Sequence, residues 1–183
     1  MMTNDILPEY VVLVDADNRV LGTMEKLEAH EKGLLHRAFS VLLFNDAGQT
    51  LIQKRAHGKY HTPGLWTNAC CSHPREGEDV LAAASRRLWE ELGIEIPSDA
   101  LKTLGTFIYK ASFSNGLTEH ELDTMIQGHY NGRAEAFNPE EVDAVRWLDD
   151  LAGNPMLLTV MCVVHTYRGK LPRERARLYY ECI

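Results

Sequence analysis

The sequence has little that suits a disulfide-rich, nucleic-acid-binding or membrane-spanning protein. Its four cysteines are few for 183 residues, and two of them are adjacent, so a disulfide scaffold is not expected. Nineteen Lys and Arg against 26 Asp and Glu leave no large basic field for a nucleic-acid backbone. The longest mostly apolar stretch, 156–164, is about half of the roughly 20 residues that a membrane helix needs. We therefore expect a soluble protein that binds neither nucleic acid nor membrane.

The length and composition fit one globular domain. With 45% apolar and 25% charged residues, the chain can bury one sizeable core, and no repeat divides it. Segment 1–9 has no basic residue and precedes only a short apolar run, so we expect no secretory signal and a reducing, cytoplasmic location. We predict a single domain over residues 1–183, as a monomer or small homo-oligomer.

Residue patterns predict several strands around one long helix. β-Branched and aromatic runs predict a terminal hairpin, with a strand over 10–15 and an extended continuation from 20, and a second hairpin of strands 39–45 and 49–55 around the turn 46–48. They also predict strands over 103–114 and 118–130 on either side of the hairpin turn 115–116, and a last strand over 143–148. From 78 to 92 the apolar residues recur at three- and four-residue steps and Gly93 follows, which predicts an amphipathic helix. Segment 154–167 is also helix-like, with a basic continuation.

The predicted helix 78–92 carries charges in a pattern suited to phosphate chemistry. Glu91 follows Arg87 by four residues, so the two share a helix face and can pair. A Pro- and Gly-containing loop precedes the helix, and acidic residues gather near its end, a layout suited to a hard divalent cation. Such a cation would bridge to a phosphate group.

This segment resembles the Nudix box, G-x5-E-x7-R-E-U-x-E-E-x-G-U, where U is apolar. The matching residues are Glu78, Arg86, Leu88, Glu90, Glu91, Gly93 and Ile94. Ser72 stands where the first Gly is expected, and Arg87 replaces the Glu after the Arg. In Nudix hydrolases that Glu belongs to the acidic cluster around magnesium, so its replacement by a cation argues for a different reaction of the diphosphate.

A second motif lies just upstream, where Cys71 stands two residues before His73. Alone, this triplet fits an inert buried thiol and a core imidazole as well as a catalytic pair. In the context W-T-N-x-C-C-S-H-P before an altered Nudix box, it resembles type 1 isopentenyl diphosphate isomerase. Segments 25–30, 35–40 and 119–123 resemble further motifs of that family. Four separated blocks in order make this family the leading interpretation.

The resemblance implies a fold and a reaction. The fold is α+β, a Nudix-like α/β/α sandwich with a mixed β-sheet and an amino-terminal β-hairpin extension. The reaction is the isomerisation of isopentenyl diphosphate to dimethylallyl diphosphate, used in isoprenoid precursor biosynthesis, by adding a proton at one end of the alkene and removing another. The partner is thus a small homoallylic or allylic diphosphate.

The resemblance also assigns site residues. One divalent metal, Mn2+ or Zn2+, would be bound by His30, His36, His73, Glu119 and Glu121, a mixed nitrogen and oxygen set that suits such ions. On a strand Glu119 and Glu121 share a face while His120 points away. Mg2+, carried by Glu91, would accompany the substrate diphosphate. The diphosphate would be held by Lys26, Arg55, Lys59 and Arg87.

The catalytic pair implied by the resemblance is Cys71 and Glu121 on opposite faces of the substrate. Tyr109 would relay or orient a proton, with a core or rim tyrosine as the plain alternative. Trp66 would present a π-face to the carbocation or simply pack in the core. The family's further Trp near the carboxy terminus has no counterpart, since residues 157–160 are Leu-Leu-Thr-Val.

Two other functions stay open at this point. Glu78, Glu90 and Glu91 would also suit a Nudix hydrolase of a diphosphate-containing metabolite. A non-catalytic, metal-stabilised binding module would use Cys71 and the histidines structurally.

Overall fold

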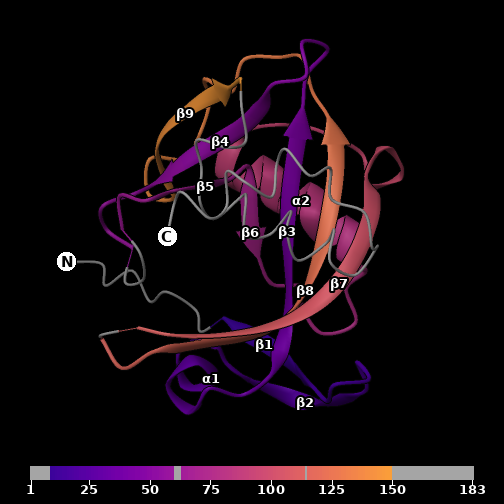
Figure 1. Cartoon of the computed structure of the whole chain (residues 1–183), viewed down its shortest axis with the longest axis vertical. Helices are drawn as coiled ribbons and strands as arrows, with labels where there is room; N and C mark the ends of the chain where they lie inside the picture. The colour runs from indigo at the N-terminus through magenta and orange to yellow at the C-terminus, as the bar shows by residue number, and fades with distance from the viewer. Residues whose placement is uncertain (1–8, 60–62, 114, 150–183) are drawn as a thin grey trace, which may run out of the picture.

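The computed structural model describes residues 9–59, 63–113 and 115–149, which form one mixed sheet with a helix packed on it (Figure 1). The strands are β1 (Tyr10–Val14), β2 (Val20–Glu25), β3 (His36–Phe44), β4 (Thr50–Arg55), β5 (Trp66–Asn68), β6 (Cys70–Ser72), β7 (Lys102–Ser112), β8 (Thr118–His129) and β9 (Val142–Leu148). The helices are α1 (Lys26–Lys32), α2 (Val80–Leu92) and the 3-10 turn η1 (Ser98–Ala100). The predicted helix 154–167, Cys162 and Cys182 lie outside the described residues.

Strand β3 is the centre of the sheet. It runs parallel to β8 from the pair His36–Glu121 to the pair Phe44–His129, and antiparallel to β6 and β1. β7 pairs along β8, and β1 forms the amino-terminal hairpin with β2. The mixed sheet and the hairpin extension predicted from the sequence are confirmed. Among the described helices, none is long and apolar enough to cross a membrane.

Alternation along β3 separates two apolar clusters. Val41 and Leu43 belong to the cluster that buries Leu88 and Leu92 of α2. Leu42 belongs to a different cluster, with Met125 of β8 and other side chains. Because side chains alternate along a strand, Ser40 shares the face of Leu42. The residues at odd positions on β8 share the face of Met125 by the same rule, so the polar residues of β3 and β8 meet on the side away from α2.

The long helix and most of the strands agree with the sequence patterns, with three corrections. The helix begins at Val80 and not at residue 78, because the Asp79 carboxylate caps it by accepting bonds from the amides of Leu81 and Ala82. The hairpin expected over 39–55 is paired only at Phe44–Thr50. β3 pairs instead with β6 and β8, and β4 with β5 and β9.

The third correction concerns short elements. Helix α1 was not predicted, and strands β5 and β6 lie in a stretch interpreted as turns. Both strands have three residues, too few to show an alternating pattern. Their partners are strands distant in sequence, β4 for β5 and β3 for β6.

Gly93 ends α2 in a left-handed conformation that a side chain would strain. Its φ is 63°, and a Cβ there would lie 2.8 Å from the carbonyl oxygen of Ala136. We expect Gly93→Ala to lower the free energy of unfolding by about 2 to 4 kcal/mol, from left-handed strain plus the clash. Gly48 has φ 76° with nothing near its Cβ position, so Gly48→Ala should cost only about 1 to 2 kcal/mol. Urea unfolding of both variants measures the difference; equal losses would contradict the clash.

Candidate functional site

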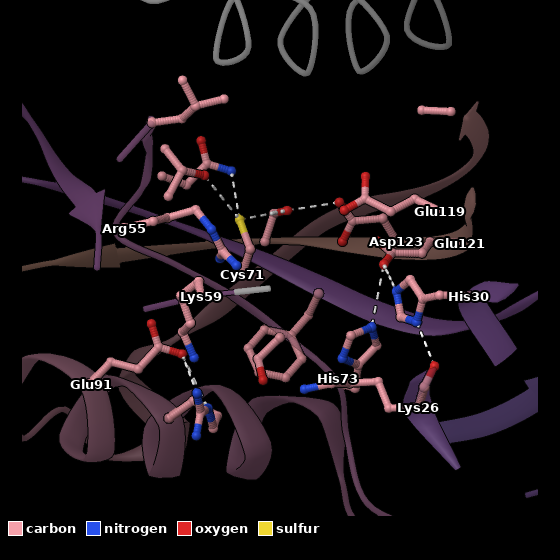
Figure 2. Close-up of a pocket in the computed structure, with 18 of the residues that line it drawn as sticks. Lys26, His30, Arg55, Lys59, Cys71, His73, Glu91, Glu119, Glu121 and Asp123 are labelled. Atoms are coloured by element: carbon pink, nitrogen blue, oxygen red, sulfur yellow. Dashed lines mark hydrogen bonds and ion pairs between the residues drawn. The ribbon is translucent and has the colours of Figure 1, made fainter. Parts of the chain in front are cut away.

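A cavity of about 370 Å³ collects the predicted site residues (Figure 2). The predicted residues that line it are Lys26, His30, Arg55, Lys59, Trp66, Cys71, His73, Arg87, Glu91, Tyr109, Glu119 and Glu121. His36 does not line the cavity, because it is fully buried behind the Glu121 carboxylate. Segments that are far apart in the sequence thus contribute to one site.

Three imidazoles converge on one carboxylate oxygen. The Nε2 atoms of His73, His36 and His30 lie 3.3, 3.6 and 3.9 Å from Oε1 of Glu121. All four ligand atoms lie within 4.8 Å of one another. They come from α1, β3, the residue after β6, and β8, and the β3–β8 register sets His36 opposite Glu121. This is the geometry of a site for one divalent cation.

Backbone carbonyls orient two of these imidazoles. Nδ1 of His30 lies 2.6 Å from the carbonyl oxygen of Lys26, and Nδ1 of His36 lies 2.8 Å from that of Leu34. A carbonyl only accepts, so each Nδ1 carries the proton and each Nε2 presents a lone pair. Nε2 of His36 is buried without a hydrogen-bond partner. A metal ion would accept the lone pair of that atom. Burial lowers the pKa of His30 and of His73, which favours the neutral imidazole that binds metals.

Tyr109 joins the two glutamates of β8. Its hydroxyl donates to Oε2 of Glu121 at 2.6 Å and lies 3.2 Å from Oε2 of Glu119. Burial and the charge of Glu121 raise the pKa of Glu119 to about 7. Burial opposes the ionised form of Glu121 too, but the His36 and His73 imidazoles beside it hold its pKa well below the usual range. Glu119 lies outside the four-ligand group, so its role as a ligand stays a prediction, while His120 bonds the Gly33 carbonyl instead.

The Cys71 sulfur faces the cavity among polar groups. It lies 3.4 Å from Nδ2 of Asn68, 3.5 Å from Oγ of Ser40 and 3.6 Å from Oγ1 of Thr67. Burial raises the pKa of the Cys71 thiol to about 12, so it is protonated at neutral pH. Figure 2 shows Cys71 and the carboxylates Glu119, Glu121 and Asp123 in the same pocket.

Sequence reasoning missed Ser40 and Asp123. Ser40 Oγ donates to Oδ2 of Asp123 at 2.8 Å, and both residues are buried at the cavity. Burial and the charge of Glu121 raise the pKa of Asp123 to about 7. The alternation of β8 carried the signal, because Asp123 follows Glu121 by two residues and so shares its face.

Cations and carboxylates alternate at another part of the cavity. The predicted pair is confirmed, with Nη2 of Arg87 2.6 Å from Oε1 of Glu91. Arg87 also lies 3.6 Å from Glu141, which pairs with Lys59. Lys26 pairs with Glu9 in the same manner. Glu9 and Glu141 were not predicted; they neutralise cations that would otherwise repel one another.

One face of the Trp66 ring is covered by a guanidinium group. The Arg146 guanidinium carbon lies 4.2 Å from the ring centroid, and the indole also packs with the apolar cluster of Leu42 and Ile52. Trp66 lines the cavity as well, so its π-face role stays a prediction beside its packing role.

The Nudix-box helix is stabilised by a bidentate pair whose contribution depends on pH. Glu78 accepts two bonds from Arg86, at 2.7 and 2.8 Å, and these bonds lower the Glu78 pKa. A lowered native pKa stabilises the fold above the unfolded value of 4.5, and that stability is lost as the pH falls below it. We expect Glu78→Gln to cost about 1 kcal/mol at pH 7 and less at pH 3, by denaturant unfolding at both. A loss of equal size at pH 3 would contradict this.

Comparisons with known proteins agree with the geometry. The NUDIX domain family matches residues 34–150. An isopentenyl-diphosphate Delta-isomerase of Aliivibrio fischeri strain MJ11 is 50% identical over 145 residues, which cover 77% of this chain and 80% of that protein. The isomerase of Serratia proteamaculans is 46% identical over 78% of each chain. The crystal structure of DR0079 from Deinococcus radiodurans superposes with a TM-score of 0.62 at 23% identity, over 85% of this chain and 90% of that one.

Proposed function

Since the chain belongs to the Nudix family, among its isopentenyl-diphosphate Delta-isomerases, we propose that it converts isopentenyl diphosphate to dimethylallyl diphosphate. The observation that carries the proposal is the placement of a protonated thiol, Cys71, and an ionised, imidazole-held carboxylate, Glu121, in one cavity. Moving an alkene bond needs a proton donor and a proton acceptor with little competing water.

Cys71 and Glu121 are the proposed acid and base. An alkene is a weak base, so the acid has to be held against the substrate carbon; both groups lie on the cavity surface. Tyr109 is proposed to hold Glu121, because its hydroxyl donates to Oε2 at 2.6 Å and so restricts the orientation of the carboxylate. Burial raises the Tyr109 pKa, which keeps its hydroxyl a donor.

The four-ligand group supports a divalent metal, for which we propose Mn2+ or Zn2+ bound by His30, His36, His73 and Glu121. When bound, the metal would supply positive charge that fixes the direction of the Glu121 carboxylate and lowers its proton affinity. The chain itself orients the imidazoles through backbone carbonyls. Mg2+ at Glu91, with the substrate diphosphate, is a second proposal; Glu91 is buried and bonds Gln53 and Arg87.

The cations of the cavity are the proposed diphosphate site, namely Lys26, Arg55, Lys59 and Arg87. We expect Lys59→Met to raise KM for isopentenyl diphosphate about tenfold and to change kcat less than about threefold, because a charge-assisted phosphate contact is made equally in the ground and transition states. Lys102 is an exposed cation that does not line the cavity, so Lys102→Met is the matched control. Initial rates over a range of substrate concentration separate KM from kcat; a loss confined to kcat would contradict the assignment.

The hydrolase alternative has less support from the site. Arg87 stands where a hydrolase keeps a magnesium-binding Glu, and it bonds both Glu90 and Glu91. The discriminating experiment incubates the metal-loaded protein with isopentenyl diphosphate in deuterated water. The isomerase incorporates deuterium into dimethylallyl diphosphate and releases no phosphate. Release of phosphate or diphosphate without labelled product would reject the proposal and favour hydrolysis.

A further inference from the structure

The hydrogen bonds around Cys71 have a direction. Ser40 Oγ donates to the Asp123 carboxylate at 2.8 Å. A hydroxyl has one proton, so once it is donated to Asp123 only lone pairs remain toward the Cys71 sulfur, 3.5 Å away. The thiol is then the donor in the contact between Cys71 and Ser40.

Of the other two neighbours of the sulfur, Thr67 Oγ1 at 3.6 Å can donate or accept, whereas Asn68 has the opposite role to Ser40. The Asn68 amide nitrogen, 3.4 Å from Cys71 Sγ, can only donate, so the sulfur accepts from Asn68 while it donates to Ser40. The backbone supports this arrangement, because Cys71 of β6 is the antiparallel partner of Ser40 on β3. Asp123 lies on β8, the strand on the other edge of β3.

We propose that Ser40 and Asp123 are positioning residues for Cys71, and that Ser40, polarised by Asp123, keeps the thiol proton on the β3 side and the side chain in one orientation at the cavity. The line Asp123–Ser40–Cys71 crosses three adjacent strands, β8, β3 and β6. Deleting the hydroxyl removes the nearer of two hydroxyl acceptors of the thiol and leaves Thr67 Oγ1, 3.6 Å from the sulfur. Changing the carboxylate to an amide lets the line run in the reverse direction, because an amide can also donate.

The first test measures the reactivity of Cys71 in the metal-loaded protein with iodoacetamide at pH 8, by mass spectrometry of the Cys71 peptide. In Asp123→Asn the amide donates to Ser40 and the Ser40 hydroxyl turns to donate to the sulfur, which favours the thiolate. We expect alkylation about tenfold faster than in the wild type, equivalent to one unit of thiol pKa. The double variant Ser40→Ala/Asp123→Asn should be alkylated no faster than Ser40→Ala, because without the Ser40 hydroxyl no hydrogen bond links residue 123 to the thiol.

Two outcomes of this test overturn the proposal. One is an unchanged or slower rate in Asp123→Asn. The other is the same acceleration with and without Ser40, which would mean that the Asp123 charge acts directly on the thiol. Cys70 is the internal control, because it is its fully buried neighbour on β6 and packs in the core beside α2. Local loosening would increase the labelling of both cysteines, and the hydrogen-bond line only that of Cys71.

The second test uses turnover and rests on the proposed function, whereas the alkylation does not. We expect Ser40→Ala to lower kcat about tenfold at unchanged KM, and Ser40→Thr, which keeps the hydroxyl, to restore kcat to within about threefold. Ser85→Ala is the matched control, since that hydroxyl bonds the Ile96 carbonyl outside the cavity. If Asp123→Asn also exposes Cys70, these kcat values decide. Equal kcat in Ser40→Ala and wild type, or failure of Ser40→Thr to restore it, overturns the proposal.

Discussion

Replacing Cys71 with Ala is expected to lower kcat for isomerisation by roughly 10³-fold, the range of one positioned acid or base. The thiol is at the cavity surface and carries no phosphate-binding charge, so KM should stay within about threefold of the wild-type value. The hydrogen bonds between the Cys71 sulfur and its neighbours are long and weak, so their loss should lower the melting temperature by no more than about 3 °C. Steady-state rates and thermal unfolding measure the two effects.

The neighbouring thiol provides the control for this experiment. Cys70 is fully buried on the other face of β6, where it packs in the core and its thiol donates to Oε1 of Glu91 at 3.5 Å. Cys70→Ala should therefore lower stability by about 1 kcal/mol and lower kcat far less than Cys71→Ala. The reverse pattern, a large stability loss and full activity in Cys71→Ala, would support the metal-stabilised binding module over the isomerase.

Replacing Glu121 with Gln is expected to remove both metal binding and turnover. The amide keeps the shape of the side chain but loses the charge on which three Nε2 atoms converge. We expect the metal affinity to fall more than about 100-fold and kcat to fall at least about 10³-fold, since a ligand and a proton-transfer group are lost together. Metal content of the purified protein and titration with Mn2+ or Zn2+ measure the first effect independently of the reaction.

Glu95→Gln removes an exposed carboxylate that does not line the cavity, and it should leave metal content and kcat unchanged. Full metal content in Glu121→Gln would contradict the proposed coordination even if activity were lost. Removing the metal from the wild type by chelation should also lower the melting temperature, because an ion that binds only the native state stabilises it by about 4 kcal/mol at 1,000 times Kd. The same shift should be absent in Glu121→Gln.

Most of the site was predictable where short motifs carry it. The Cys71–His73 triplet and the Glu119–Glu121 pair are local in sequence, and strand alternation already places the two glutamates on one face. Helix α2 was predictable because its apolar period extends over several turns and ends at a glycine with positive φ. The single-domain boundary and the oligomeric state stay predictions.

What could not be predicted depends on pairing between distant segments. β5 and β6 are strands only because β4 and β3 lie beside them, and Ser40 meets Cys71 only through that pairing. Glu141 contacts Lys59 and Arg87 from a distant position in the chain, and the periodicity of apolar residues in the sequence does not predict such an ion pair. The direction of the hydrogen bonds around the Cys71 thiol was likewise not predictable, because it depends on the bond from Ser40 of β3 to Asp123 of β8.

The parallel pairing of β3 with β8 has a consequence for assembly of the protein. His36 and Glu121 oppose each other in the first pair of that ladder, although residues 37–120 separate them in the chain. A slip of one residue would turn Glu121 to the opposite side of the sheet and leave the imidazoles without their shared oxygen. Metal binding would therefore stabilise only the native register of the two strands. The ion would then favour correct folding as well as take part in the reaction.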